Sequence, residues 1–93
     1  MKEFIVFIVK HLVDNPDEVR VTEKQDDKGM LYRLYVNESD IGRVVGKEGR
    51  TAKSIRTLLN AAAARRGLRA SLEIMDATRR AAEARSAERG DEI

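Results

Sequence analysis

Apolar residues near the start of the chain follow a helical spacing. The repeating positions are Phe4, Ile5, Ile8, Val9, Leu12 and Val13. This pattern predicts an amphipathic helix over residues 3–13, although the β-branched residues would also suit a strand. The helix is favoured because Asp14-Asn15-Pro16 then supplies a stop and a turn. Phe4 and Phe7 are expected in the core, or shared between the core and a dimer contact.

The next two segments alternate apolar and polar residues with the period of two that is typical of strands. Residues 19–24 and 30–36 show this alternation, and Asp26-Asp27-Lys28-Gly29 between them has the composition of a turn. The two segments are therefore predicted to form a β-hairpin. Tyr32 and Tyr35 point to opposite faces of the second strand, so at most one of them can lie in the core between sheet and helices.

The middle of the chain predicts a short helix followed by a long one. Several capping side chains at residues 37–40 precede the short helix, Ile41 to Val45, which Gly46 and Gly49 then interrupt. The long helix runs from Arg50 to about Arg66. Its apolar stripe consists of Ala52, Ile55, Leu58, Leu59, Ala62 and Ala63.

The last part of the chain predicts a third strand and then a polar tail. Gly67 suits a helix C-cap, and residues 68–74 alternate again. Residues 77–93 are mainly Ala, Arg and Glu, with only alanine methyl groups to bury, which predicts a flexible or transiently helical tail. The sequence thus predicts one α+β domain over residues 1–76, with the order α-β-β-α-α-β and a three-stranded sheet packed on helices.

Composition narrows the classes of function. The chain of 93 residues contains no Cys and one His, which excludes disulfides, thiolate sites and a His-based metal cluster. The lack of Cys also favours a reducing, cytoplasmic setting. The longest apolar run, Phe4 to Val9, is too short to span a bilayer, and no cleavage site of a signal peptide follows it. The composition thus indicates a cytoplasmic protein with no metal site. We expect the protein to be non-enzymatic and to have no cofactor.

Positive charge is concentrated in the centre of the sequence. The net charge of the whole chain is only +2, but residues 39–69 carry +6 and each flanking segment carries −2. Such a local field attracts a polyanion, although Lys and Arg are also ordinary residues of a solvated helix face. The basic residues of the segment are Arg43, Lys47, Arg50, Lys53, Arg56, Arg65, Arg66 and Arg69.

The loop between the two central helices has features of a phosphate-binding site. Residues 46–49 read Gly-Lys-Glu-Gly, and glycine at both ends lets a sugar-phosphate backbone come close. The first N–H groups of the following helix suit a phosphate. Lys47 can add a mobile cation, and Arg50 and Lys53 stand in the first turn of the helix, where a purely structural role would favour acidic residues. Glu48 is expected to point to solvent.

Other interpretations fit parts of this loop. The spacing from Gly42 to Lys47 is one residue short of a P-loop, and Glu48 stands where that motif has Ser or Thr, which argues against nucleotide hydrolysis. A helix-turn-helix that reads duplex DNA also joins two helices through a Gly-containing turn, but usually in an all-helical domain. The glycines could also form a plain helix corner, and the basic segment could bind an acidic partner protein.

The segment from Ile41 to Arg50, followed by Thr51-Ala52-Lys53-Ser54-Ile55, resembles a KH domain. In these domains a Gly-x-x-Gly loop clamps single-stranded nucleic acid. A helix and hairpin before the loop, and a strand after the long helix, resemble the type II arrangement. The size and the Met1-Lys2-Glu3 opening are similar to those of small stand-alone bacterial KH-domain proteins, the KhpA family. The resemblance covers residues 1 to about 76.

This resemblance implies RNA binding in a groove for about four nucleotides. Gly46 and Gly49 would admit the RNA backbone, Lys47 and Arg50 would contact phosphate, and residues 69–74 would form the second wall. The apolar residues of the short helix would form a floor under the bases. The implied RNA-binding residues are Ile41, Arg43, Val44, Val45, Gly46, Lys47, Glu48, Gly49, Arg50, Lys53 and Arg69.

The resemblance also implies a role and partners. An aromatic content of 4% agrees with an aliphatic groove better than with an aromatic stacking platform. The implied function is that of an RNA chaperone or post-transcriptional regulator that binds single-stranded RNA. The implied protein partner is a second copy of the chain or a larger KH protein of the Jag/KhpB type.

Overall fold

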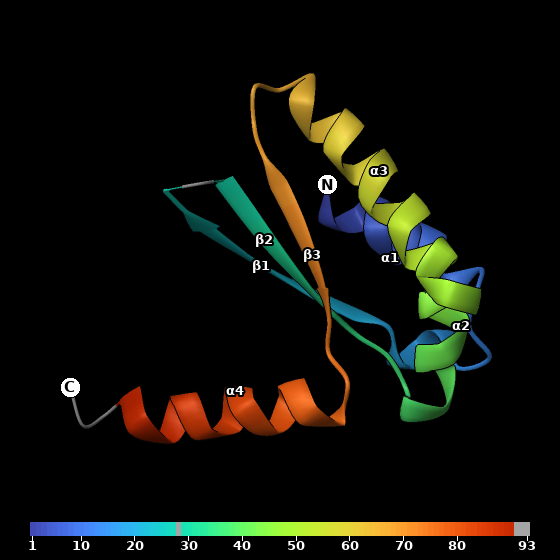
Figure 1. Ribbon diagram of the computed structural model, residues 1–93, viewed down its shortest axis with the longest axis vertical. Coiled ribbons are helices and arrows are strands. Elements are labelled where there is room, and N and C mark those ends of the chain that lie inside the picture. Colours follow the sequence, from blue (N-terminus) through green and yellow to red (C-terminus); the bar gives the residue numbers. More distant parts are fainter. Residues whose placement is uncertain (28, 91–93) are drawn as a thin grey trace.

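The computed structural model describes the backbone of residues 1–27 and 29–90, and the side chains of residues 1–27 and 29–86. Lys28 of the predicted turn and residues 91–93 of the predicted tail lie outside the described residues. The helices and strands are α1 (Lys2–Lys10), β1 (Arg20–Asp26), β2 (Gly29–Tyr35), α2 (Ile41–Val45), α3 (Arg50–Ala64), β3 (Ala70–Ile74) and α4 (Ala77–Gly90). This order confirms the predicted α-β-β-α-α-β arrangement (Figure 1).

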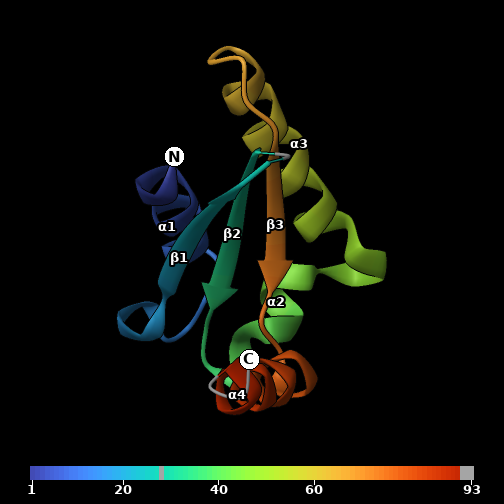
Figure 2. The same ribbon diagram turned by 90° about the vertical axis from the view of Figure 1, so that its left-hand side faces the viewer.

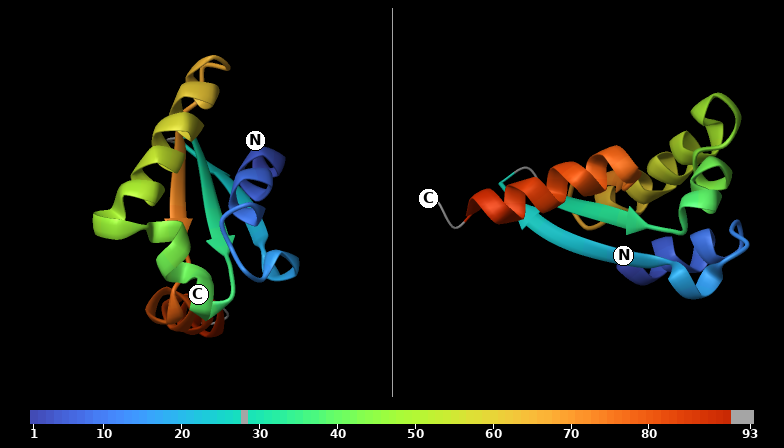
Figure 3. Two further views of the ribbon diagram at one scale, coloured as in Figure 1. Left: turned by 90° about the vertical axis from the view of Figure 1, so that its right-hand side faces the viewer. Right: turned by 90° about the horizontal axis from the view of Figure 1, so that it is seen from below.

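The three strands form one mixed sheet in the order β1-β2-β3. β1 and β2 pair antiparallel, with Arg20 opposite Tyr35, while β2 and β3 pair parallel, with Met30 opposite Ala70. Helices α1 and α3 lie on one side of the sheet, and α4 lies on the other side near the ends of β2 and β3 (Figures 1 and 2). The junction between α2 and α3 projects from the body of the molecule (Figure 3).

The core fills the space between the sheet and the helices α1, α2 and α3. Strand residues of alternate positions point into it, as the period of two predicts. Burying a large apolar side chain fully contributes about 1.5–3 kcal/mol, so these residues hold the helices in place. Those that are fully buried include Ile5, Val9, Leu34, Val44 and Leu59.

Helix α1 differs from its prediction in length and in the face that it buries. It ends at Lys10, earlier than predicted, and the next two residues form a turn. Its buried residues are Ile5 and Val9, whereas Phe4 is 38% and Phe7 66% exposed. The core position predicted for the two phenylalanines is therefore wrong. At about 100° per residue, Phe7 lies on the face opposite Ile5 and Val9, and Phe4 lies about 120° from them. A contact of these residues with a second chain stays a prediction.

Helix α3 buries a narrower stripe than the sequence predicts. Its buried residues are Ala52, Ile55, Leu59 and Ala63. Leu58 is 52% exposed, so its predicted burial is wrong. Successive residues of a helix are about 100° apart around its axis, and Leu58 is therefore turned away from the side on which its neighbour Leu59 is buried. The chain leaves α3 through Gly67, which has φ of 71°, and the N–H of the next residue, Leu68, donates a 3.0 Å hydrogen bond to the carbonyl of Ala63. This is the role of a glycine just after a helix end, although the capping residue itself is Arg65.

The segment after β3 is the helix α4. Tyr32 lies in the core, while Tyr35 is buried outside it, on the side of the sheet where α4 lies. The sequence did not predict this second site of burial, because α4 offers few apolar side chains and its contacts are polar. The sequence also predicts that this segment is flexible or only transiently helical. This concerns motion, and it stays a prediction. No helix within the described residues is both long and apolar enough to cross a membrane.

Candidate nucleic-acid interface

The loop between α2 and α3 has an unusual backbone. Gly46 and Gly49 have φ of 77° and 74°, and Glu48 between them has φ of 56°. Glu48 is the one non-glycine residue with positive φ in the described part of the chain. This conformation costs an ordinary residue roughly 1–2 kcal/mol, and it turns consecutive peptide groups so that the loop bulges outward. The composition of the loop gave no signal of this strain at Glu48.

The two glycines of the loop have different structural roles. A Cβ at Gly46 would overlap the hydroxyl of Thr51 and lie 2.7 Å from the Cβ of that residue. Gly46 is therefore needed for the loop to pack against the first turn of α3. A Cβ at Gly49 would meet nothing within 4 Å, so only its positive φ requires glycine and the space outside it is open.

The basic side chains around the loop are exposed. Arg50 Nη2 lies 3.3 Å from Glu48 Oε2, and Arg43 Nη2 lies 3.0 Å from Asp14 Oδ2. Both ion pairs are exposed, where such pairs are worth about 0–1 kcal/mol, so a phosphate can replace either carboxylate. Lys47 and Lys53 are also exposed, and no ion pair to their side chains is present in the described residues.

The apolar residues of α2 divide into two groups. Ile41 and Val45 are half-buried and line a small pocket of about 180 Å³ that also includes Gly49 and Ile74. Val44 is fully buried in the core. The predicted floor is therefore made by two of the three residues, and Val44 supports it from inside instead of lining it.

Arg69 lies away from the loop. It precedes β3, and its carbonyl accepts a hydrogen bond of 2.8 Å from the N–H of Met30. Ile74, which lines the pocket, is at the other end of β3, and a five-residue strand spans roughly 16 Å. Arg65 and Arg66 belong to the same α3–β3 connection as Arg69. The basic segment thus forms two separate surfaces, which the count of charges along the sequence could not reveal.

Asp40 fixes the position of α2. It is fully buried, and its carboxylate accepts hydrogen bonds of 3.0–3.1 Å from the N–H groups of Asp14 and Asn15 and from the side-chain amide of Asn15. Burial alone would raise the pKa of Asp40, but these hydrogen bonds and the nearby Arg43 lower it below its usual value. The sequence predicts Asp40 only as one of several capping side chains, because an acid before a helix is typical of a cap.

Two further arginines reach the pocket. Arg56 Nε donates a 3.2 Å hydrogen bond to the carbonyl of Leu72, which ties α3 to β3, and Arg79 comes from α4. Arg56 had been counted only as part of the basic segment. Arg79 follows the predicted domain, so the sequence gave no reason to connect it with the loop.

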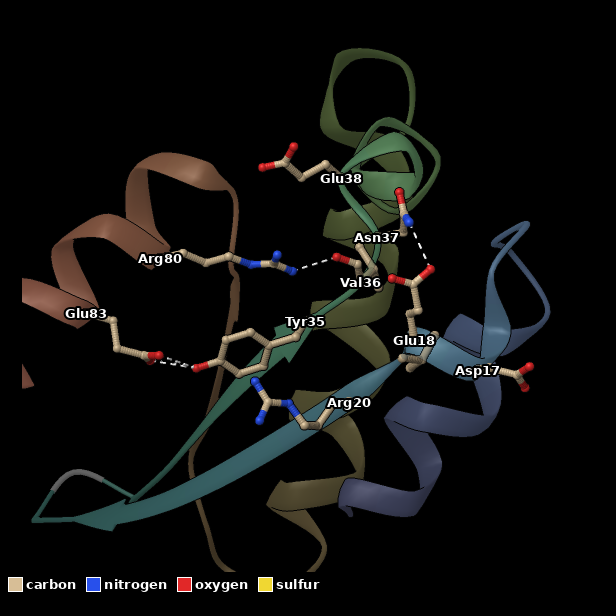
Figure 4. Close-up of a pocket in the computed structure, with 10 residues that line it drawn as sticks. Asp17, Glu18, Arg20, Tyr35, Val36, Asn37, Glu38, Arg80 and Glu83 are labelled. Atoms are coloured by element: carbon tan, nitrogen blue, oxygen red, sulfur yellow. Dashed lines mark hydrogen bonds between the residues drawn. The ribbon is translucent and has the colours of Figure 1, made fainter.

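A wider pocket of about 840 Å³ lies beside Tyr35 (Figure 4). Four of its lining residues are acidic: Asp17, Glu18, Glu38 and Glu83. That charge does not suit a polyanion, so the smaller pocket at the loop is the better candidate for nucleic acid. No cluster of three or more potential metal ligands occurs in the residues that the structure describes.

Comparison with known proteins decides the family. The family model described as the KH domain of KhpA/KhpB matches residues 2–74. The chain belongs to this family. Among its relatives, the RNA-binding protein KhpA of Chlamydia pneumoniae is 54% identical over 76 residues, which are 82% of this chain and 97% of the relative.

Other members of the KhpA family match over the same length. The RNA-binding protein KhpA of Listeria monocytogenes serovar 1/2a is 45% identical over 76 residues, covering 82% of this chain and all of the relative. That of Borreliella burgdorferi is 47% identical over 74 residues, covering 80% of this chain and 90% of the relative. No solved structure matches significantly. Because the family match ends at residue 74, helix α4 lies outside the shared KH domain.

Proposed function

We propose that the chain binds single-stranded RNA in the groove beside the loop of residues 46–49. The observation that carries this proposal is the combination of an outward-turned loop, open space at Gly49 and a pocket, partly lined by Ile41 and Val45, next to exposed cations. The relatives are named RNA-binding proteins, which supports RNA as the ligand.

Each part of the site has a role in this proposal. Lys47, Arg50 and Lys53 contact phosphates, and Arg43 joins them when it releases Asp14. Ile41 and Val45 contact bases, supported from inside by Val44. Gly46, Glu48 and Gly49 give the loop its shape. Arg69 contacts the RNA only when the RNA is long enough to reach the end of β3 that is farther from the loop. Because phosphates dominate these contacts, binding is weakly selective for sequence and falls steeply with salt.

The test of the groove is a double substitution in the loop, Lys47→Asp with Glu48→Asp. It reverses one charge, and Asp tolerates the positive φ of position 48 at least as well as Glu. We expect RNA binding to fall below detection, that is by about 100-fold or more, since a cation–phosphate contact becomes a repulsion. Affinity is measured by fluorescence anisotropy with a short single-stranded RNA, and the fold is checked by circular dichroism.

A matched control is available on the hairpin. The pair Glu23→Asp and Lys24→Asp makes the same changes at adjacent exposed residues of β1, and it should bind RNA normally. Normal binding by the loop variant would show the groove to be wrong. Tighter binding to duplex DNA than to RNA would favour a helix-turn-helix function, and no binding to any nucleic acid at low salt would favour a protein-interaction module.

We further infer that the protein acts in the cytoplasm as an RNA chaperone or post-transcriptional regulator, paired with a second KH chain. The family model covers both KhpA and KhpB, and Phe7 and Leu58 are exposed apolar residues available for pairing. Sedimentation analysis of Phe7→Glu and Leu58→Glu, alone and with a KhpB-type protein, tests this pairing. Unchanged sedimentation of every mixture would contradict it.

A further inference from the structure

Helix α4 supplies a guanidinium group to the pocket beside the loop. Arg79 lines this pocket together with Ile41, Val45 and Gly49 from the loop side. Arg56 of α3 lines it as well. Two arginines from separate elements thus flank a cavity of mixed polar and apolar lining beside the loop, and the acidic residue Asp76 also lines it. One of the two arginines, Arg79, lies outside the KH domain that the family shares.

The position of α4 is set by polar contacts to the sheet (Figure 4). The hydroxyl of Tyr35 donates to the carboxylate of Glu83, with oxygen–oxygen distances of 2.6 and 2.8 Å. Arg33 Nη1 donates to the same carboxylate at 3.1 Å, and Arg80 Nη2 donates to the carbonyl of Val36 at 2.6 Å. Because these contacts have defined directions, they fix the orientation of α4 as well as its place.

Tyr35 is the centre of these contacts. The guanidinium of Arg20 lies 4.2 Å and that of Arg80 5.7 Å from the centre of its ring. Burial, and then the hydrogen bond to Glu83, raise the pKa of Tyr35. The hydroxyl therefore stays protonated at neutral pH and remains a donor to Glu83.

The first turn of α4 directs Arg79 toward the groove. Asp76 Oδ1 accepts a 2.8 Å hydrogen bond from the N–H of Arg79, which caps the helix at this point. Arg79 Nη1 also lies 3.9 Å from Glu73 Oε1, at the limit of an ion pair, and the Arg79 side chain is 49% exposed. This weak, solvated pair leaves the guanidinium available for a stronger anion.

We propose that α4 extends the RNA groove and that Arg79 binds a phosphate of the RNA held beside Gly49. In this proposal Glu83 is a positioning residue, because it holds α4 in place. The inference rests on the proposed function of the loop. A guanidinium suits this task because its fork of donors matches two oxygens of one phosphate. Relatives that consist of the KH domain alone lack this contact, so the chain described here holds RNA at one more point.

The direct test is Arg79→Ala, compared with Arg85→Ala as a matched control. Arg85 is an exposed arginine of the same helix and lines none of the pockets described above. For Arg79→Ala we expect about 3- to 10-fold weaker binding to a short single-stranded RNA. The slope of log affinity against log salt should become shallower by about 0.7, the value for one phosphate contact on a single strand. Arg85→Ala should change neither quantity.

The positioning role is tested by Glu83→Gln and Tyr35→Phe in the full chain. Each should weaken RNA binding by a smaller factor than Arg79→Ala, and neither should add to the effect of Arg79→Ala in a double variant. Such non-additivity indicates action through Arg79. Full additivity would overturn the positioning role, since a general loss of stability would add to the loss of Arg79.

The outcomes separate this inference from the proposed function. If the loop variant loses RNA binding while Arg79→Ala binds normally, the extension of the groove is wrong and the loop site stands. Tighter binding by Arg79→Ala would also overturn the inference, because α4 would then obstruct the groove. If both variants bind normally, the proposed function itself fails.

Discussion

The two ends of helix α3 carry similar positive charge but differ in everything around it. At its N-terminal end, Lys47 and Arg50 stand beside a strained loop and a small pocket of mixed polar and apolar lining. At the other end, Arg65, Arg66 and Arg69 lie exposed on the connection between α3 and β3, which contains Gly67. The proposed function assigns RNA binding to the first end alone, because only there is the backbone shaped to receive a ligand.

The largest expected effect comes from the glycines at the loop end. Gly46→Ala should destabilise the fold by about 2–3 kcal/mol, because it adds an overlap with Thr51 to the cost of a positive φ. Gly49→Ala, which has open space, should cost only about 1–2 kcal/mol. Urea unfolding measures both. Equal losses of stability would contradict the distinct roles of the two residues.

A smaller effect should separate the two basic ends directly. Lys47→Ala and Arg66→Ala each remove one exposed positive charge, the first at the loop and the second at the far end of α3. We expect Lys47→Ala to weaken binding to a four-nucleotide RNA about 3- to 10-fold, and Arg66→Ala less than twofold, because a ligand of that length fills only the groove. Titrations at a single salt concentration measure both. Similar losses would mean that the ends act as one surface.

The smallest expected effect is a loss of fold stability at low pH. The lowered pKa of Asp40 means that this carboxylate stabilises the fold above the pKa of an unfolded Asp, about 3.9. The stabilisation is lost as the pH falls through the lowered pKa. Amide exchange should therefore rise at residues 14–15 and 41–45 before it rises at residues 65–69. The Asp40→Asn variant should have a lower melting temperature at neutral pH, and its melting temperature should fall less as the pH is lowered. An identical acid response in that variant would contradict this role of Asp40.

The order of elements and the loop were predictable because they depend on local patterns. Alternation predicted the strands, periodicity predicted α3, and the Gly-Lys-Glu-Gly sequence identified the loop. Leu58 and the phenylalanines of α1 were harder to place, because a helix with apolar residues on several faces does not reveal which face meets the sheet.

The missed features depend on contacts between distant residues. Glu83 contacts Tyr35 and Arg33, which are 48 and 50 residues earlier in the sequence. Nothing in an Ala/Arg/Glu segment predicts such partners, because the helix is anchored by hydrogen bonds instead of an apolar stripe. The separation of Arg69 from the loop likewise follows from the direction of β3, which only the folded chain reveals.

The parallel pairing of β2 and β3 has a consequence for the timing of folding. The chain between these strands contains α2, the loop and α3, and Ile74 completes the pocket only after β3 has paired. Pairings between residues so far apart in sequence form slowly, because a long segment must first be closed. The proposed RNA site is therefore completed late in folding, and any ligand that occupies it binds the native state alone. Bound RNA should thus shift the folding equilibrium toward the native chain in proportion to the logarithm of its concentration.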